Sequence, residues 1–237
     1  MDETASIIEF RGLPEALSDS RIFTAIREIT DPHYQNPLVL LDQEAINNDH
    51  IYLSWRGSAL DGFFMTGWQE ASKAGQRDGC VYLGLSGVHP SQRGKGLGTR
   101  LYRRFLLDSE SWVTRTERPL WYWFYTASPF AASAWHRMVP SLSPSPIGDY
   151  DPRALHLLES LAPKHGWAPH RCPRHPFLLR KFATARYAQN ETEAFISSGA
   201  GDSGFLSRMA VDKQSGDRVI FVGVTESAQG RPKRHAP

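Results

Sequence analysis

The sequence lacks the features that identify a membrane-spanning or disulfide-stabilised chain. No run of about 18 apolar residues occurs in its 237 residues, so we expect no membrane contact. Its two cysteines, Cys80 and Cys172, are too few for a disulfide framework and suit a reducing compartment. The acidic start, Met1-Asp2-Glu3-Thr4, has no signal-peptide pattern. We therefore expect a cytoplasmic protein.

A strong net charge is also absent. The formal charge is +2, and the 41% hydrophobic and 22% charged content is ordinary for a globular protein with a substantial core. Only the segment Arg231–His235 is locally basic, which predicts a disordered basic tail over 226–237. A near-neutral chain is not expected to bind nucleic acid.

The most informative stretch of the chain runs from Val81 to Leu101. Residues 81–88 are rich in apolar and β-favouring side chains, which predicts a buried strand that Pro90 ends. Glycines then alternate at 94, 96 and 98, and a helix with an apolar stripe begins. Such a loop favours an anion, because the first amides of a helix have no partners within it and carry partial positive charge.

Spacing excludes three common motifs in this stretch. A Walker loop ending at Lys95 would need Gly at 89 and Ser or Thr at 96, which are His89 and Gly96. A dinucleotide fingerprint starting at Gly94 would need Gly where Thr99 stands. The segment 84–87, Gly-Leu-Ser-Gly, lacks the closing glycine of a hydrolase nucleophile elbow.

The pattern that fits is Arg-x-x-Gly-x-Gly, at Arg93, Gly96 and Gly98, after a strand that ends in Val-x-Pro. It resembles the acyl-CoA loop of the GNAT superfamily of N-acetyltransferases. The resemblance implies acetyl-CoA (or another acyl-CoA) as cosubstrate, with its pyrophosphate on the loop amides and its pantetheine arm beside the strand. The alternative is a Gly-rich turn that only caps a helix. The resemblance implies that the CoA-binding residues are Val88, Arg93, Gly94, Lys95, Gly96, Leu97, Gly98, Thr99 and Ser128.

The order of predicted elements fits the fold of that family as far as about residue 138. We expect an α/β (α+β) fold, a central mixed twisted sheet flanked by helices, as one domain over 1–237. Strands are predicted at 6–10, 51–55, 59–67, 81–88, 120–125, 204–211 and 218–225, and helices at 20–29, from the loop to about 108–110, and from 128. Residues 37–48 are ambiguous, and 73–79 are a polar connector.

Before the last two predicted strands lies a helical insertion, residues 140–202. It is too long for a plain loop. Helices are predicted at 151–164 and, more weakly, within 177–197. The insertion is either a substrate lid or an oligomer arm, and a homodimer is left open.

The groups that would perform acyl transfer are less clear than the loop. In the family, a tyrosine of an Asn-x-x-Ala-x-x-x-Tyr helix is often the general acid, but this chain has Ser128, Ala131 and Trp135 there. No carboxylate occurs within 81–88 to serve as a base. The resemblance implies an oxyanion-stabilising amide near Val88, and Gly84 and Gly87 suit a distorted strand.

Three residues are candidates for proton transfer. Tyr125 ends an aromatic strand and could reach the CoA thiolate; His89 ends the central strand; His136 follows the position of the missing tyrosine. A further group, His165, His170, Cys172 and His175, has zinc-binding residue types, but its spacing matches no standard finger and we expect no metal.

The predicted function is N-acyl transfer from acyl-CoA to a primary amine by direct attack in a ternary complex. The alternative is a non-catalytic acyl-CoA-binding or regulatory module that has lost the general acid. An acceptor carried on a nucleic acid, such as an aminoacyl-tRNA, is left open by the arginines Arg100, Arg103 and Arg104 and by segment 171–181.

Overall fold

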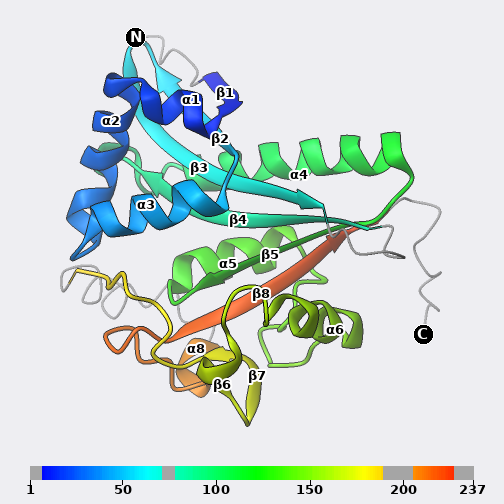
Figure 1. The fold of residues 1–237 in the computed structure, drawn as a ribbon. Coiled ribbons are helices and arrows are strands. Elements are labelled where there is room, and N and C mark those ends of the chain that lie inside the picture. The colour runs from blue at the N-terminus through cyan, green and yellow to red at the C-terminus, as the bar shows by residue number, and fades with distance from the viewer. Residues whose placement is uncertain (1–6, 71–77, 189–204, 227–237) are drawn as a thin grey trace.

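A computed structural model describes residues 7–70, 78–188 and 205–226 (Figure 1). Most of the predicted connector 73–79 and of the predicted tail 226–237 lies outside these residues. The elements are β1 (Ile7–Gly12), α1 (Leu13–Ser18), α2 (Ser20–Thr30), η1 (Asp31–His33), α3 (Pro37–Asn47), β2 (His50–Arg56), β3 (Ala59–Glu70), β4 (Gly79–Val88), η2 (Pro90–Gln92), α4 (Leu97–Thr116), β5 (Leu120–Thr126), α5 (Pro129–Met138), α6 (Pro152–Leu161), η3 (Ala168–His170), β6 (Arg171–Cys172), β7 (His175–Leu179), α8 (Phe205–Arg208) and β8 (Arg218–Thr225).

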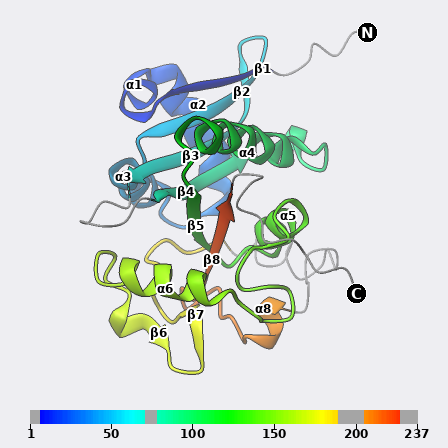
Figure 2. The same cartoon turned by 90° about the vertical axis from the view of Figure 1, so that its right-hand side faces the viewer.

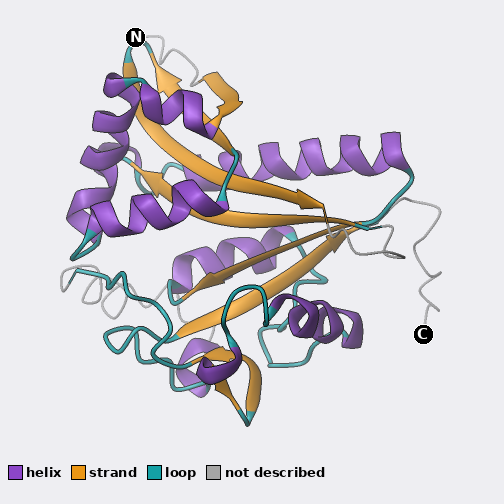
Figure 3. Cartoon of the chain, in the orientation of Figure 1, coloured by secondary structure: helices purple, strands orange, loops and turns teal. Residues whose placement is uncertain are grey.

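One mixed sheet organises the molecule. Among the described residues its strand order is β1-β2-β3-β4-β5-β8-β7-β6. All neighbours are antiparallel except β4 and β5, which are parallel. Helices lie on both sides of the sheet (Figures 2 and 3). The predicted mixed sheet flanked by helices is confirmed.

The two faces of the sheet have different helical covers. Phe105 of α4 packs edge-on against Phe64 of β3 and Tyr122 of β5, with ring centroids 6.0 and 5.7 Å apart. On the opposite face, the buried apolar residues of α1, α2 and α3 pack against alternate positions of β2 and β3, such as Leu53 and Phe63. We call these the α4 face and the α3 face.

Helix α4 begins at the Gly-rich loop and is longer than its sequence predicts. It continues to Thr116 rather than ending near residue 110, because Val113 is still buried and Glu117 ends the helix in a left-handed conformation. The ambiguous segment 37–48 is helix α3, which starts with Pro37 in its first turn and buries Leu40, Leu41 and Glu44.

The region after residue 140 differs most from expectation. Helix α6 matches the predicted helix at 151–164, but the described start of the predicted helix 177–197 is wrong, because His175–Leu179 is β7. The predicted strand 204–211 is also wrong: residues 205–208 are helical. The cause is that β7 pairs with β8 through Leu178 and Val219, and so occupies the sheet edge that the predicted strand would have used.

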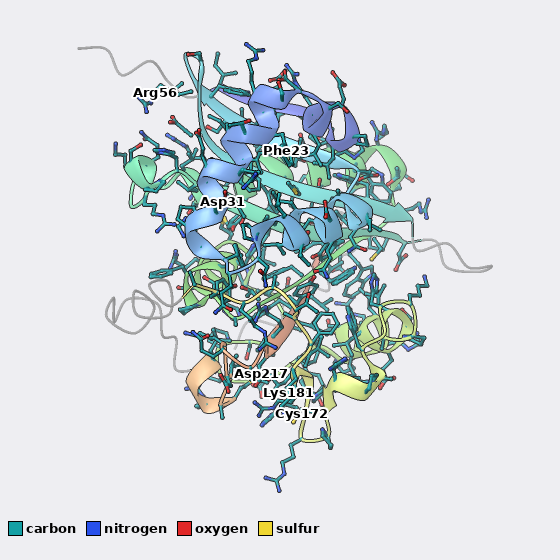
Figure 4. All side chains as sticks on the ribbon, turned by 60° about the vertical axis from the view of Figure 1, so that its left-hand side comes forward. Phe23, Asp31, Arg56, Cys172, Lys181 and Asp217 are labelled. Atoms are coloured by element: carbon teal, nitrogen blue, oxygen red, sulfur yellow. The ribbon has the colours of Figure 1, made fainter. Side chains whose placement is uncertain are left out.

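A buried carboxylate fixes the start of β8. Asp217 is 1% exposed and accepts hydrogen bonds from the main-chain N–H of Lys181 at 3.0 Å and from the Arg180 guanidinium. Burial alone would raise the pKa of Asp217, but these bonds outweigh it and lower that pKa. Figure 4 labels Asp217 and Lys181 side by side near the foot of the molecule. These bonds join the end of β7 to the start of β8, its neighbour in the sheet.

No helix in the described ranges is long and apolar enough to cross a membrane.

Candidate functional site

Strands β4 and β5 separate halfway along their length. They pair in register only from Gly79 with Leu120 to Tyr82 with Trp123, and beyond that point β4 is paired with β3 alone. Figure 1 shows the two arrows meeting at one end and diverging at the other. A cavity of about 1310 Å³ occupies this region and is lined by residues from both faces of the sheet.

The Gly-rich loop forms one end of the cavity. Gly94 and Gly96 have φ values of +74° and +75°, which side chains disfavour, and a Cβ on either would meet only open space. The glycines are therefore explained by backbone conformation, not by close packing. Within the described residues, no hydrogen bond is donated by the amides of Gly94, Gly96, Leu97, Gly98 and Thr99.

Most residues predicted to bind CoA line this end of the cavity. Lys95 is the exception, since it does not contribute to the lining. Ser128 caps α5 by accepting from the amide of Ala131 at 3.4 Å, and brings a second helix start to the same cavity. Arg93 and Arg137 add positive charge. The lining includes Val88, Arg93, Gly94, Gly96, Leu97, Gly98, Thr99 and Ser128.

The central strand is distorted by a bulge at Gly84 and Leu85. Leu83 pairs with Thr66 and Ser86 pairs with Phe64, so two residues of β4 oppose one residue of β3. A Cβ on Gly84 would lie 2.5 Å from a carboxylate oxygen of Glu44. Gly84 therefore admits the side chain of Glu44 to the strand. Glycine at position 87 has a different explanation, because a Cβ added there would lie 2.7 Å from Ile29 and from Phe63.

Glu44 supplies the carboxylate that the sequence of β4 lacks. It is 3% exposed and accepts from the Tyr82 hydroxyl at 3.0 Å, the Leu85 N–H at 3.1 Å and the Asn48 amide at 2.8 Å. Burial raises the pKa of Glu44, and these three bonds only partly offset the increase. A buried carboxyl group with a raised pKa, lining a cavity, has the properties of a general base.

Sequence reasoning missed Glu44 because the helical assignment of residues 37–48 was ambiguous. Once that segment is known to be a helix, Glu44 lies one turn after Leu40 and Leu41 on the buried side. A lone acidic residue on an apolar helix face is the signal that identifies it, because such a residue is rarely buried without a purpose.

Tyr125 is the predicted catalytic candidate that the structure brings to Glu44. The rings of Tyr125 and Tyr82 stack with centroids 5.9 Å apart, and Tyr82 in turn donates to Glu44. Burial raises the pKa of Tyr125, the charge of Glu44 raises it further, and the interaction with the Tyr82 hydroxyl lowers it. Tyr125, Tyr82 and Glu44 thus form a polar series along the α3 face of the gap.

The two histidine candidates lie elsewhere. The imidazole of His89 contacts the Ser91 hydroxyl at 2.8 Å, and that of His136 contacts the Pro144 carbonyl oxygen at 2.9 Å. Neither residue lines the cavity. Burial lowers the pKa of His136, which a bond to Pro144 partly offsets. Trp135, at the position of the family tyrosine, does line the cavity and stacks on Tyr102 at 4.8 Å.

The other end of the cavity is closed by a segment of the insertion, residues 182–188, which we call the strap. Its start is held by Gly216, whose carbonyl oxygen accepts from the amides of Phe182 and Ala183. Its end lies beside η1, on the far side of the gap. One contact there is an antiparallel bridge between Tyr34 and Tyr187. In addition, the main-chain N–H of Gln35 donates a hydrogen bond to the carbonyl oxygen of Arg186, and that of Ala188 donates to the carbonyl oxygen of His33.

The strap is one part of the insertion that lines the cavity. It crosses from β7 to the N-terminal half and lines the cavity with Phe182, Ala183, Thr184, Ala185 and Tyr187. This part of the insertion is therefore a wall of the site.

The candidate zinc ligands do not converge. His165 packs against Trp167 and Trp123, while the imidazole of His170 contacts the carbonyl oxygen of Arg180 at 2.9 Å. Across the described ranges, no group of three or more His, Cys, Asp or Glu side chains is placed to hold a metal ion.

Comparisons with known proteins identify relatives by structure only. No protein-family model matches the chain, and no curated protein sequence matches it. A ribosomal-protein-S18-alanine N-acetyltransferase from Escherichia coli aligns over 95% of this chain and 99% of its own, with 9% identity and a TM-score of 0.48. An IAA acetyltransferase from Bacillus cereus aligns over 58% and 80%, with 13% identity and a TM-score of 0.39.

An acyl-CoA N-acyltransferase from Pseudomonas aeruginosa aligns over 56% of this chain and 87% of its own, with 16% identity and a TM-score of 0.37. Many of the matching structures are acetyltransferases of the GNAT family, the kind of protein that the loop sequence resembles. At such identities the likeness assigns no role to any residue of this chain.

Proposed function

We propose that this chain is an acyl-CoA-dependent N-acyltransferase that transfers an acetyl or other acyl group to a primary amine by direct attack. The observation that carries the proposal is one cavity that joins an unsatisfied, Gly-rich helix start to a gap between parallel strands, with a buried carboxylate beside it.

The donor end of the cavity suits acyl-CoA. The amides of Gly96, Leu97 and Gly98 are available for the pyrophosphate, and the side chains of Arg93 and Arg137 add positive charge. The unpaired edge of β4 from Leu83 to Val88 offers peptide groups to an extended pantetheine arm, as a sheet edge does to an added strand.

At the reacting centre, the amine must be neutral before it attacks. Glu44 accepts the proton of the ammonium form, directly or through the Tyr82 hydroxyl. The amine nitrogen then bonds to the thioester carbonyl carbon, and a main-chain amide of β4 near Val88 stabilises the oxyanion. The carbon–sulfur bond breaks, and the thiolate takes a proton from the Tyr125 hydroxyl. The nitrogen loses its second proton to solvent as the amide forms. Glu44 returns its proton to Tyr125 through Tyr82, so the enzyme ends in its starting state, with the acylated amine, free CoA thiol and one proton in solvent as products.

Calorimetric titration with acetyl-CoA tests the donor site. The folded protein should bind acetyl-CoA, and the double variant Gly96→Glu/Gly98→Glu should not, because its carboxylates would occupy the pyrophosphate seat. No binding by the wild-type protein at hundreds of micromolar would overturn the proposal.

Release of free thiol from acetyl-CoA in the presence of a panel of primary amines tests the transfer. Acetylation of an amine, with Glu44→Gln far slower, is the expected result. Binding of acetyl-CoA without turnover of any amine would favour a non-catalytic acyl-CoA-binding module instead.

A further inference from the structure

A buried cation at the acceptor end of the cavity has no acidic partner among the residues that the structure describes. Arg218, the first residue of β8, is only 4% exposed, although arginine is rarely buried unless it is paired. Within the described residues no carboxylate lies within ion-pair distance of its guanidinium. The carboxylate next to it in sequence, Asp217, is bonded instead to Arg180 and to the N–H of Lys181.

Neutral groups hold the guanidinium of Arg218 in place. Its Nη1 donates to the carbonyl oxygen of Asp217 and its Nη2 to that of Ala185 in the strap, both at 2.8 Å. Its Cζ lies 4.9 Å from the ring centroid of Tyr187. These contacts orient the fork but do not compensate its charge, because a carbonyl oxygen or an aromatic face carries no net charge.

The register of the sheet places Arg218 beside Tyr125. Tyr125 lies opposite Ile220 on β8, so Arg218 is two residues further along the same strand and on the same face, a diagonal neighbour. Arg218 lines the cavity, as does Glu44, whose partner Tyr82 also lies on this side of the gap. Glu44 and Arg218 therefore lie on either side of Tyr125 on the α3 face. Helix α4, which begins at the donor loop, covers the opposite face of the sheet.

The charges of the cavity lining leave the acceptor end positive. Glu44 contributes the only carboxylate among the described lining residues, and hydrogen bonds from Tyr82, Asn48 and Leu85 already engage it. Lys164 adds a second cation on the insertion side. A substrate that entered this end with a positive charge alone would leave Arg218 unpaired.

We infer that Arg218 binds a carboxylate of the acceptor, so that the acceptor is an amino-carboxylate: its amine faces Glu44 and the thioester, and its carboxylate pairs with the guanidinium. This inference rests on the proposed function. Pairing a planar carboxylate with an oriented guanidinium fork gives strong charge-assisted hydrogen bonds and fixes the amine in the gap.

The test compares acceptors that differ only in the carboxylate. Thiol release from acetyl-CoA is measured for the common amino acids, including β- and ω-amino acids, and for the primary amide of each. The proteins are the wild type, Arg218→Met, Arg218→Lys and, as a matched control, Arg115→Met, which removes an exposed arginine near the end of α4, far from the cavity lining. The quantity compared is the ratio of kcat/KM for an acid to that for its amide.

We expect the wild type and the control to favour the acid by about 10- to 100-fold, as for a hydrogen bond to a charged group. Arg218→Met should bring this ratio close to one, mainly through KM, and Arg218→Lys should restore part of it. Calorimetric titration of the preferred amino acid into the CoA-loaded protein should show the same loss in Arg218→Met.

Three outcomes would overturn the inference. Arg218→Met could slow acid and amide equally, which would make the residue purely structural. Arg218→Met could weaken acetyl-CoA binding and leave the acid-to-amide ratio of kcat/KM unchanged, which would assign the guanidinium to a CoA phosphate. A wild type that binds acetyl-CoA yet acetylates only amines without a carboxylate, or no member of the panel, would exclude an amino-carboxylate. Failure to bind acetyl-CoA at all would instead remove the proposed function.

Discussion

The two ends of the cavity are built on different principles. The donor end is built mainly from one continuous stretch, residues 88–99, with the start of α5 beside it, and it presents main-chain amides around two glycines of positive φ. The acceptor end is assembled from α3, β5, the strap and β8, and it presents side chains: Glu44, Tyr125 and Arg218. A backbone site fits any ligand with the same diphosphate, whereas a side-chain site selects a particular acceptor. The difference suits a common cosubstrate and a specific substrate.

Removing the carboxyl group of Glu44 should give the largest difference between an effect on turnover at the acceptor end and an effect on binding at the donor end. For Glu44→Gln we expect kcat to fall by about 10²- to 10⁴-fold, the usual contribution of a general base. The dissociation constant for acetyl-CoA should stay unchanged, because Glu44 lies at the acceptor end. Steady-state kinetics and calorimetric titration check the two expectations.

The same variant should also differ from the wild type in how its stability depends on pH. Because the folded protein raises the pKa of Glu44, its charged form costs stability once the pH rises above the ordinary value of 4.5. Glu44→Gln should therefore be at least as stable as the wild type at pH 8, and the difference should vanish below pH 4.5. A variant that is less stable at pH 8 would show that the hydrogen bonds to Tyr82 and Leu85 outweigh the buried charge.

A negative charge placed in the donor loop should impair acetyl-CoA binding at the donor end. Gly96→Glu should weaken acetyl-CoA binding by about 100-fold, since it sets an anion beside the seat of the pyrophosphate. Gly57→Glu is the matched control: Gly57 has a φ of +61° and open space around its missing Cβ, as Gly96 has, but lies in the β2–β3 turn. Both variants should lose similar stability, and only Gly96→Glu should lose binding.

The Tyr125 hydroxyl should matter for turnover and little for donor affinity. Tyr125→Phe should lower kcat by about 100-fold, the lower end of the usual contribution of a general acid, because the leaving thiolate loses its proton donor. Tyr122→Phe removes a buried hydroxyl from the same strand on the α4 face, outside the cavity lining, and should keep its kcat. Equal kcat values for the two variants would remove Tyr125 from the mechanism.

The smallest expected effect concerns the anchor of β8. Asp217→Asn should lower the unfolding free energy by about 1.5–3 kcal/mol, the range for hydrogen bonds to a charged group. Asp31→Asn, which loses a half-exposed pair with Arg27, should cost at most about 1 kcal/mol. Urea unfolding of the two variants, both sites labelled in Figure 4, measures the difference.

The pH dependence of this effect follows from the lowered pKa of Asp217. The carboxylate stabilises the fold above its ordinary pKa of 3.8, and that stability is lost as the pH falls through its lower folded value. The gap between the wild type and Asp217→Asn should therefore be constant near neutrality and narrow below pH 3.8. A gap that widens in acid would contradict the lowered pKa.

The Gly-rich loop and the strands as far as β5 could be predicted from residues that are close together in the chain. The glycines at 94 and 96 permit the positive φ of their own backbone, and the alternating or continuous apolar runs encode β2, β3, β4 and β5, because both signals depend on residues close in the chain. After residue 140, α6 and β8 agree with the predicted helix and the predicted last strand, but β7 is not predicted, because it is a short apolar run whose identity as a strand depends on pairing with β8.

The side chains that meet on the α3 face of the cavity are brought together by the tertiary structure alone. Glu44, Tyr82, Tyr125 and Arg218 come from four separate elements, and no local pattern links them. They meet because β4 is bulged at Gly84, because β4 and β5 part after Tyr82, and because β8 pairs antiparallel with β5. Side-chain chemistry between distant residues is set by strand register and burial, and these exist only in the folded chain.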